Sequence, residues 1–95
     1  MYGILYTRDF KKSLKKLQKS GKMSDKIKGK LEVAIDTLVA GNELSKTYRD
    51  HQLKGVFKDK RECHIKGDLV LVYKREEDAL VLIMVEIGTH SQIFG

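Results

Sequence analysis

Two apolar runs near the end of the chain constrain its fold most strongly: Leu-Val-Leu-Val-Tyr at residues 69–73 and Leu-Val-Leu-Ile-Met-Val at residues 80–85. Runs of this length without polar interruption are typical of strands in the middle of a sheet. Turn-forming residues precede and separate them, at 66–68 and at 76–78. Residues 61–66 alternate between apolar and polar side chains, as a half-buried strand does. We therefore expect an antiparallel meander of these strands.

The first half of the chain has helical periodicity instead. Residues 2–6 predict a short strand, and Thr7 is an N-cap residue type before a helix that ends near Gly21. A second helix is expected from Ser24 to about Gly41. The apolar stripes of the two helices consist of Phe10, Leu14 and Leu17, and of Ile27, Leu31, Ala34, Ile35 and Leu38. The predicted fold class is α+β, with an N-terminal strand and a two-helix hairpin packed on a curved antiparallel sheet.

Length and composition predict one domain over residues 1–95, because either half alone would be too small to bury a core. No apolar run approaches the roughly 20 residues that cross a bilayer, so we expect a protein without a membrane partner. The first residues lack the pattern of a secretory signal. Cys63 is the single cysteine and has no partner for an internal disulfide. These features predict a cytoplasmic protein.

The net charge of +6 is concentrated in the helical half. Between Lys11 and Lys30 there are nine lysines and one acidic residue, Asp25. Such a surface favours a polyanion or an acidic protein as partner. A solvated helix face accounts for the same pattern equally well, so charge alone does not decide the function.

The predicted turns allow the strand register to be estimated. A hairpin that turns at residues 66–68 places His64 opposite position 70. A second hairpin that turns at residues 76–77 places Asp68 opposite Val85. Residues just beyond Val85 then emerge at the same end of the sheet as the first turn.

His64, Asp68 and His90 are therefore expected to converge. His51 precedes the meander and is not placed by this reasoning. Imidazoles titrate near neutrality, and together with a carboxylate and a cation they are suited to moving protons around a phosphate. RNA cleavage by 2′-hydroxyl attack needs such a base, acid and cation. It needs no metal, and the sequence has no carboxylate cage for Mg²⁺.

Each of these residues also has an ordinary structural interpretation. His64 taken alone is more often a surface histidine, Asp68 a turn residue and Arg61 a surface cation. A zinc site that includes Cys63 is not supported, because adjacent strand residues point to opposite faces and no spaced ligand motif exists. Cys63 is most simply a core residue. From residues alone the expectation is a domain that binds or cleaves nucleic acid.

Several stretches together resemble the YafQ-like toxins of the RelE/ParE superfamily. They are Tyr-Arg-Asp-His-Gln-Leu-Lys-Gly at 48–55, Arg-Glu-Cys-His-Ile at 61–65 followed by Asp68, Tyr-Lys at 73–74, and Gly-Thr-His-Ser-Gln-Ile-Phe at 88–94. The order and spacing of these motifs make the resemblance specific, and they cover about half of the chain.

The resemblance implies the toxin of a type II toxin–antitoxin system. Such a toxin is a ribosome-dependent endoribonuclease that cuts mRNA in the A site and inhibits translation, with neither a metal nor another cofactor. The implied partners are the ribosome with its 16S rRNA, mRNA, and a cognate acidic antitoxin, with which a higher-order complex is allowed.

The resemblance also implies which residues act. His90 is expected to be the general acid, and either Asp68 or His51 the base, while His64 and Arg61 stabilise the phosphorane. The family's C-terminal aromatic residue falls on Phe94. The residues expected to contact RNA are Arg61, Lys54, Lys58, Lys60 and Phe94.

Two positions depart from the family pattern, and two rival functions remain. Leu69 stands where relatives commonly have tryptophan, which removes an aromatic face for stacking a base. Glu86 stands where relatives commonly have arginine, which replaces a phosphate partner with a carboxylate. The rivals are a non-enzymatic toxin of the gyrase-inhibitor type and a basic nucleic-acid-binding module.

Overall fold

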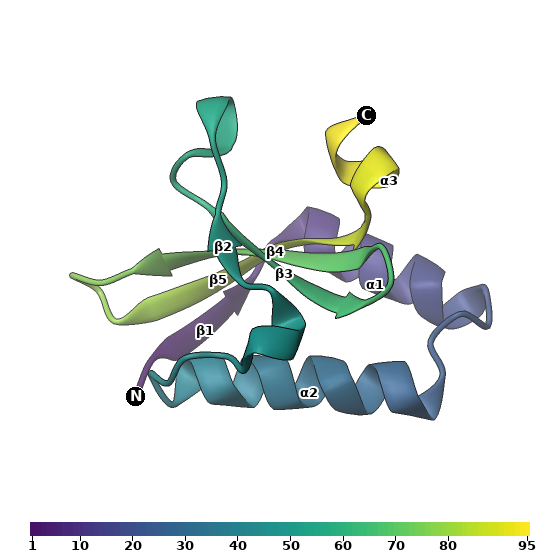
Figure 1. The fold of residues 1–95 in the computed structure, drawn as a ribbon, viewed down its shortest axis with the longest axis horizontal. Helices are drawn as coiled ribbons and strands as arrows, with labels where there is room; N and C mark the ends of the chain where they lie inside the picture. The colour runs from purple at the N-terminus through teal and green to yellow at the C-terminus, as the bar shows by residue number, and fades with distance from the viewer.

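The computed structural model describes residues 1–95. Figure 1 shows its elements, whose bounds are β1 (Gly3–Tyr6), α1 (Arg8–Lys19), α2 (Asp25–Val39), η1 (Lys46–Tyr48), β2 (His51–Gln52), η2 (Gly55–Phe57), β3 (Arg61–Lys66), β4 (Leu69–Glu76), β5 (Val81–Thr89) and α3 (His90–Phe94). None of the helices is long and apolar enough to span a membrane.

The strands form one sheet in the order β1-β5-β4-β3-β2. The pairs β3–β4 and β4–β5 are antiparallel, as predicted for the three-strand meander. The short strand β2 adds a further antiparallel pair with β3, which the sequence did not predict. β1 runs parallel to β5, with Ile4 opposite Leu82. The α+β fold class is confirmed, but the sheet is mixed rather than purely antiparallel. Both helices lie between β1 and the meander in the chain, which gives the long connection that a parallel pair needs.

Helices α1 and α2 begin directly after the residues that the sequence predicts as their N-caps. The Thr7 hydroxyl accepts a hydrogen bond from the backbone N–H of Phe10 at 3.0 Å. The Ser24 hydroxyl accepts one from the N–H of Ile27 at 3.2 Å. Gly41 follows the end of α2 with a φ of +82°, a conformation that glycine adopts without steric cost.

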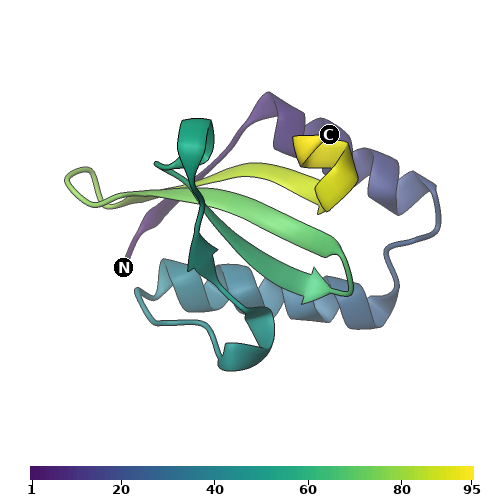
Figure 2. The ribbon, with the colours of Figure 1, turned by 45° about the horizontal axis from the view of Figure 1, so that its top comes forward.

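The two faces of the sheet have different coverings. Helices α1 and α2 pack on one face through Phe10, Leu31, Ala34 and Leu38, against apolar side chains of β3, β4 and β5. The segment around β2 and η2 and the helix α3 rise from the opposite face (Figures 1 and 2). The second face therefore holds a small polar layer of its own.

One predicted turn lies later in the chain than expected. β4 continues to Glu76 and β5 begins at Val81, so residues 77–80 form the connection. Leu80, which was expected in a strand, is exposed and has a φ of +52°. The prediction placed Leu80 in the strand because it continues an apolar run. Its side chain lies outside the sheet, on the tip of the hairpin.

This shift changes the register between β4 and β5. Leu69 pairs with Thr89, so the prediction that Asp68 lies opposite Val85 was wrong. The prediction for the other hairpin was correct, because His64 pairs with Val70. The observed register brings the start of α3, rather than the middle of β5, next to the β3–β4 turn.

An irregularity in β5 fastens the first helix to the sheet. The register shifts next to Val85, and the backbone carbonyl of this residue accepts a hydrogen bond from the Thr7 hydroxyl at 2.7 Å. The N–H of Thr7 donates to the carbonyl of Met84 at 3.0 Å. Thr7 therefore caps α1 and ties its first turn to β5 at the same time.

We predict that Thr7→Ala lowers the free energy of unfolding by about 1–2 kcal/mol, because it removes both the cap and the bond to β5. Thr7→Ser keeps the hydroxyl and should remain within about 0.5 kcal/mol of the wild type. Urea unfolding followed by circular dichroism measures both. Equal losses for the two variants would show that the methyl group, not the hydroxyl, matters at this position.

Candidate active site

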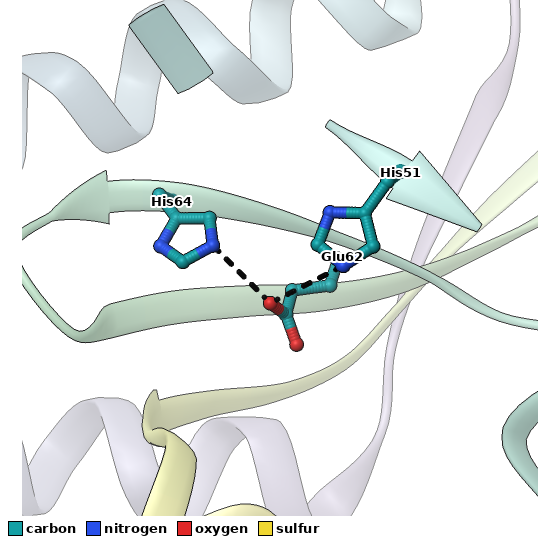
Figure 3. A group of neighbouring side chains, drawn as sticks. All are labelled: His51, Glu62 and His64. Carbon is teal, nitrogen blue, oxygen red and sulfur yellow. Dashed lines mark ion pairs between the residues drawn. The ribbon is translucent and has the colours of Figure 1, made fainter. Parts of the chain in front are cut away.

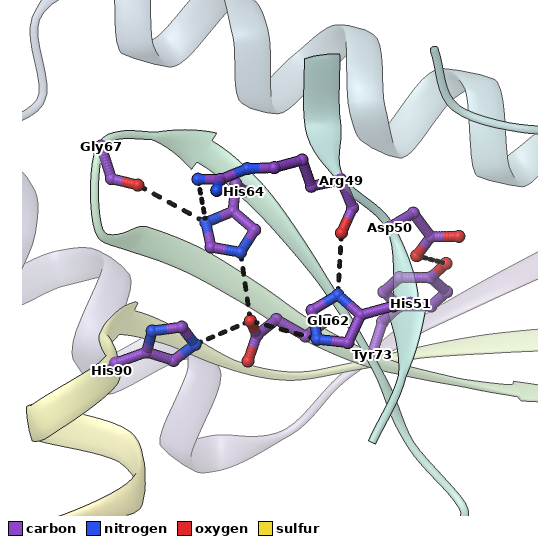
Figure 4. Close-up of polar contacts among 8 residues, drawn as sticks. All are labelled: Arg49, Asp50, His51, Glu62, His64, Gly67, Tyr73 and His90. Atoms are coloured by element: carbon purple, nitrogen blue, oxygen red, sulfur yellow. Dashed lines mark hydrogen bonds and ion pairs between the residues drawn. The ribbon is translucent and has the colours of Figure 1, made fainter. Parts of the chain in front are cut away.

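Glu62 is a buried carboxylate on the second face of the sheet. It is 1% exposed, and one of its oxygens, Oε1, faces the Nε2 atoms of three histidines. The distances are 2.7 Å to His90, 3.3 Å to His64 and 3.6 Å to His51. Figure 4 shows the three rings arranged around this carboxylate. An isolated buried charge is costly, so these imidazoles are the groups that compensate it.

Strand pairing explains how two of the histidines reach Glu62. His51 in β2 is the direct partner of Glu62 in the antiparallel β2–β3 pair. His64 lies two residues beyond Glu62 in β3, and residues two apart share a face of a strand. Their rings lie 6.2 Å apart between centroids.

The third histidine comes from the first turn of α3. Thr89 and Gln92 form a capping box, in which Gln92 donates to the Thr89 hydroxyl and accepts from the Thr89 N–H. Gly88 makes room for this turn, because a Cβ there would lie 3.0 Å from the Gln92 side-chain oxygen. His90 is thereby held with its ring centroid 5.5 Å from that of His64.

The hydrogen bonds of His51 and His64 assign different tautomers to their neutral rings. His51 Nδ1 lies 2.8 Å from the backbone oxygen of Arg49, which only accepts, so Nδ1 carries the proton and Nε2 is left bare. His64 Nδ1 lies 3.1 Å from the Arg49 guanidinium, which only donates. His64 therefore carries its proton on Nε2 and donates it toward Glu62.

A second network holds the segment that carries Arg49 and His51. The Asp50 carboxylate accepts hydrogen bonds from Arg61 at 2.9 Å and from the fully buried Tyr73 hydroxyl at 2.6 Å. The bond to Asp50 raises the pKa of Arg61, and burial raises the pKa of Tyr73. This network joins the segment before β2 to both β3 and β4.

The structure separates the predicted site residues into two groups. His51, His64 and His90 are together, as described above. Asp68 is exposed in the β3–β4 turn and has no hydrogen bond or ion pair to the histidines. Arg61 is paired with Asp50 and is not in contact with the histidine rings.

The predicted RNA-contacting residues frame the histidines. Lys54 and Lys58 are exposed near η2, and Lys60 pairs with Asp59 at 3.0 Å. Phe94 is 36% exposed and packs edge-on against Phe57, with the ring centroids 5.1 Å apart. This aromatic pair connects η2 with α3.

Sequence reasoning missed two members of the site, Glu62 and Arg49. The alternation of β3 had placed Glu62 on the same face as His64, which was the available signal, but it had also suggested that this face is solvated. Arg49 has a φ of +48°, and this conformation directs its carbonyl toward His51 while its side chain reaches His64. Nothing in the local sequence indicates that geometry.

Cys63 and Leu69 belong to the core rather than to the site. Burial raises the pKa of the Cys63 thiol to about 12, so the thiol stays protonated. It lies in the core with α1 and α2, as expected for a small apolar residue. Leu69 is 8% exposed and packs in the same core.

Comparison with known proteins agrees with this geometry. Residues 2–95 match the family described as a bacterial toxin of type II toxin–antitoxin systems, YafQ. The mRNA interferase toxin YafQ of Escherichia coli strain K12 is 32% identical over 92 residues, which are 97% of this chain and 95% of that protein. A metal-bound toxin from Helicobacter pylori has a TM-score of 0.87 at 39% identity, covering 99% of this chain and 100% of that one.

The Escherichia coli DinJ–YafQ complex has a TM-score of 0.85 at 30% identity, with both chains covered completely. The fold is thus that of a type II toxin of the RelE/ParE kind. The chain belongs to the YafQ family.

We predict that Asp50→Ala lowers the free energy of unfolding by about 2–3 kcal/mol, because it leaves the buried Tyr73 hydroxyl without an acceptor and Arg61 without its partner. Asp59→Ala is the matched control, since it removes a half-exposed carboxylate that pairs with Lys60 and Lys74. It should cost less than about 1 kcal/mol. A similar small loss for both variants in thermal or urea unfolding would contradict an anchoring role for Asp50.

Proposed function

We propose that this toxin inhibits translation by cutting mRNA in the ribosomal A site. Its family membership makes it an mRNA interferase, as YafQ of Escherichia coli is. The observation that carries the mechanism is the convergence of three imidazoles on the single buried carboxylate of Glu62. In the proposed reaction a 2′-oxygen forms a bond to the adjacent phosphorus while the bond to the 5′-oxygen breaks, which leaves a 2′,3′-cyclic phosphate.

His90 is the proposed general acid. Its Nε2 donates to Glu62 at 2.7 Å, and its Nδ1 has no partner within the protein. In the imidazolium form both ring nitrogens carry a proton, so Nδ1–H can be given to a substrate atom while Nε2–H stays bonded to Glu62. We assign Nδ1 of His90 to protonation of the departing 5′-oxygen.

His51 is the proposed general base, and its hydrogen bonds favour it over Asp68. Its Nδ1–H is fixed by the carbonyl of Arg49, so the bare Nε2 is ready to accept the proton of the 2′-hydroxyl. The side chain is 51% exposed and therefore accessible to RNA. Asp68 has no contact that would hold its carboxylate toward the histidines.

The developing charge on the phosphorane requires a cation nearby. We assign this role to His64 together with Arg49, whose guanidinium lies against the His64 ring. Arg61 donates hydrogen bonds to Asp50 and Gln52. We therefore assign it to holding the segment around β2 in position, with a weaker direct effect on the phosphate. Lys54, Lys58 and Lys60 are proposed to hold the RNA backbone as it enters.

The exposed part of Phe94 is proposed to stack an unpaired base. Leu69, at the position where relatives commonly have tryptophan, is buried in the core and presents no aromatic face. The pair of Phe57 and Phe94 is the aromatic surface nearest to His90, whose ring centroid lies 5.6 Å from that of Phe94. Base stacking of this kind tolerates many sequences.

Dependence on the ribosome is proposed from size. A chain of 95 residues has little surface with which to hold and bend an extended message. The ribosome presents a positioned codon, which supplies much of the orientation that in-line attack requires. The rival function of a non-enzymatic toxin would need no ordered histidine cluster, so the cluster supports the nuclease.

We predict that His90→Ala lowers the rate of mRNA cleavage by about 10²–10⁴-fold, the usual effect of losing a positioned proton donor. Glu62→Gln should lower it by about 10²-fold, because the rings lose the charge that orients them. Glu43→Gln removes an exposed carboxylate after α2 and should cleave like the wild type. Primer extension on an mRNA translated in vitro measures all of these.

The same assay includes purified mRNA without ribosomes, which the wild type should leave largely intact. Rapid cutting of that naked RNA would contradict ribosome dependence. A folded His90→Ala protein that cleaves at the wild-type rate would contradict the assignment of the acid and favour the non-enzymatic rival.

The proposed inhibitor is a cognate acidic antitoxin. A relative of this chain is seen in complex with DinJ, as the Escherichia coli structure shows. On α1 the lysines at 11, 12, 15 and 16 are exposed and form no ion pair within the chain. We propose that an acidic segment of the antitoxin covers them and thereby blocks entry to the ribosome.

We predict that changing Lys11, Lys12, Lys15 and Lys16 together to glutamate weakens binding of the antitoxin or the ribosome at least 10-fold at low salt. Because the attraction is electrostatic, the difference should shrink as salt rises. The same four lysines changed to arginine keep the charge and serve as the control. Unchanged affinity for both partners in isothermal titration and ribosome pelleting would show that this helix face is only solvated.

A further inference from the structure

The loop between β2 and β3 exposes an apolar side chain at its tip. Val56 in η2 is 88% exposed, more than any other large apolar side chain except that of Met1. The loop rises from the second face of the sheet (Figures 1 and 2). It joins β2, which carries His51, to β3, which carries Glu62 and His64 (Figure 3). Val56 therefore lies in a segment whose two ends both belong to the site.

Hydrogen bonds within the loop hold its shape. The N–H of Leu53 donates to the carbonyl of Lys60 at 2.9 Å, and the N–H of Lys60 donates to the carbonyl of Phe57 at 2.9 Å. The side-chain amide of Gln52 donates to the carbonyl of Lys58. A binding surface that is already ordered loses little conformational entropy when it meets a partner. The loop is thus preformed for a contact at its tip.

The ring next to Val56 anchors the loop. Phe57 packs edge-on against Phe94 in α3, with the ring centroids 5.1 Å apart, and the ring of Phe94 lies 5.6 Å from that of His90. Single exposed apolar residues are common on protein surfaces, so exposure alone indicates no function. Val56 differs from such residues because two successive ring contacts join its loop to the proposed general acid.

The charges around Val56 favour nucleic acid as its partner. Lys54 and Lys58, two residues before and two residues after Val56, are both exposed. Asp59 is the acidic residue of the loop, and it pairs with lysines 60 and 74 at 3.0 and 3.3 Å, so it does not compensate Lys54 and Lys58. An apolar side chain between two cations matches a single RNA strand, which presents flat base faces beside charged phosphates.

We propose that η2 contacts the message itself: Val56 packs against the face of an unpaired base next to the scissile phosphate, and Lys54 and Lys58 bind the phosphates on either side of that base. This proposal rests on the proposed function. In-line attack needs the 2′-oxygen, the phosphorus and the 5′-oxygen in one line, which a regularly stacked strand does not present. Apolar side chains separate stacked bases in other nucleic-acid complexes. With Phe94 on a neighbouring base, Val56 keeps the two bases apart.

The contact can be measured without cleavage, on ribosomes programmed with an mRNA that has 2′-deoxynucleotides in the A-site codon. This message lacks the attacking hydroxyl and stays intact. Val56→Ser should weaken pelleting of the toxin with these ribosomes about 10-fold, as expected when the burial of one valine side chain is lost. Val56→Leu keeps an apolar side chain and should bind within about 2-fold of the wild type. Val33→Ser changes an exposed valine of α2 and is the matched control, which should bind as the wild type does.

Because Val56 is almost fully exposed, Val56→Ser should unfold at the same urea concentration as the wild type, which separates a lost contact from a lost fold. Wild-type affinity of Val56→Ser for the programmed ribosomes would overturn the proposal. An equal loss on ribosomes without mRNA would place Val56 against the ribosome and overturn the contact with the message. A loss only in binding to the cognate antitoxin would make η2 a protein contact instead. A wild type that binds but leaves an unmodified message uncut would contradict the proposed function and leave the binding comparison intact.

Discussion

The buried carboxylate of Glu62 is the interaction on which the second face of the sheet depends. A carboxylate that is 1% exposed must be compensated by donors, and three imidazoles from separate parts of the chain face its Oε1 atom. His64 and His90 donate to it, whereas His51 can do so only when its Nε2 is also protonated. β2 contributes one ring, β3 another and the first turn of α3 the third. The same contacts that make this charge tolerable therefore bring three proton-transfer groups within reach of one phosphate. The Oε1 atom of Glu62 is thus both the charge that must be compensated and the point on which the proposed catalytic rings converge.

Around this centre the backbone decides which ring nitrogens are available. The left-handed conformation of Arg49 presents a carbonyl to one histidine and a guanidinium to another, which gives the two rings opposite tautomers. Asp50, the next residue, is fixed by Arg61 and Tyr73. These bonds hold the short loop in the conformation that orients the ring of His51, the proposed base.

Much of the fold could be predicted from the sequence, because local signals specify it. Thr7 and Ser24 cap the helices as expected, and the apolar runs became neighbouring strands. The long-range details were less accessible. Leu80 continued an apolar run but lies in a turn, and that error moved the register on which the placement of Asp68 depended.

The three histidines could be predicted as site residues, because strand alternation and the order of the motifs indicate them. Glu62 could not, because it is buried on a face of β3 that the sequence pattern predicts to be solvated. A glutamate on the polar side of a strand is normally solvated. Glu62 is buried because β2 and α3 lie over it, and nothing in the sequence next to Glu62 indicates this.

The most direct test of this account is the protonation of the imidazole nitrogens, read from long-range ¹H–¹⁵N correlation spectra of the free toxin above neutral pH. We predict that His51 carries its proton on Nδ1 and His64 on Nε2. In Glu62→Gln we expect the rings to lose these single, fixed tautomers while the protein stays folded. Finding His51 protonated on Nε2, or ring spectra that Glu62→Gln leaves unchanged, would contradict the central role of the buried carboxylate.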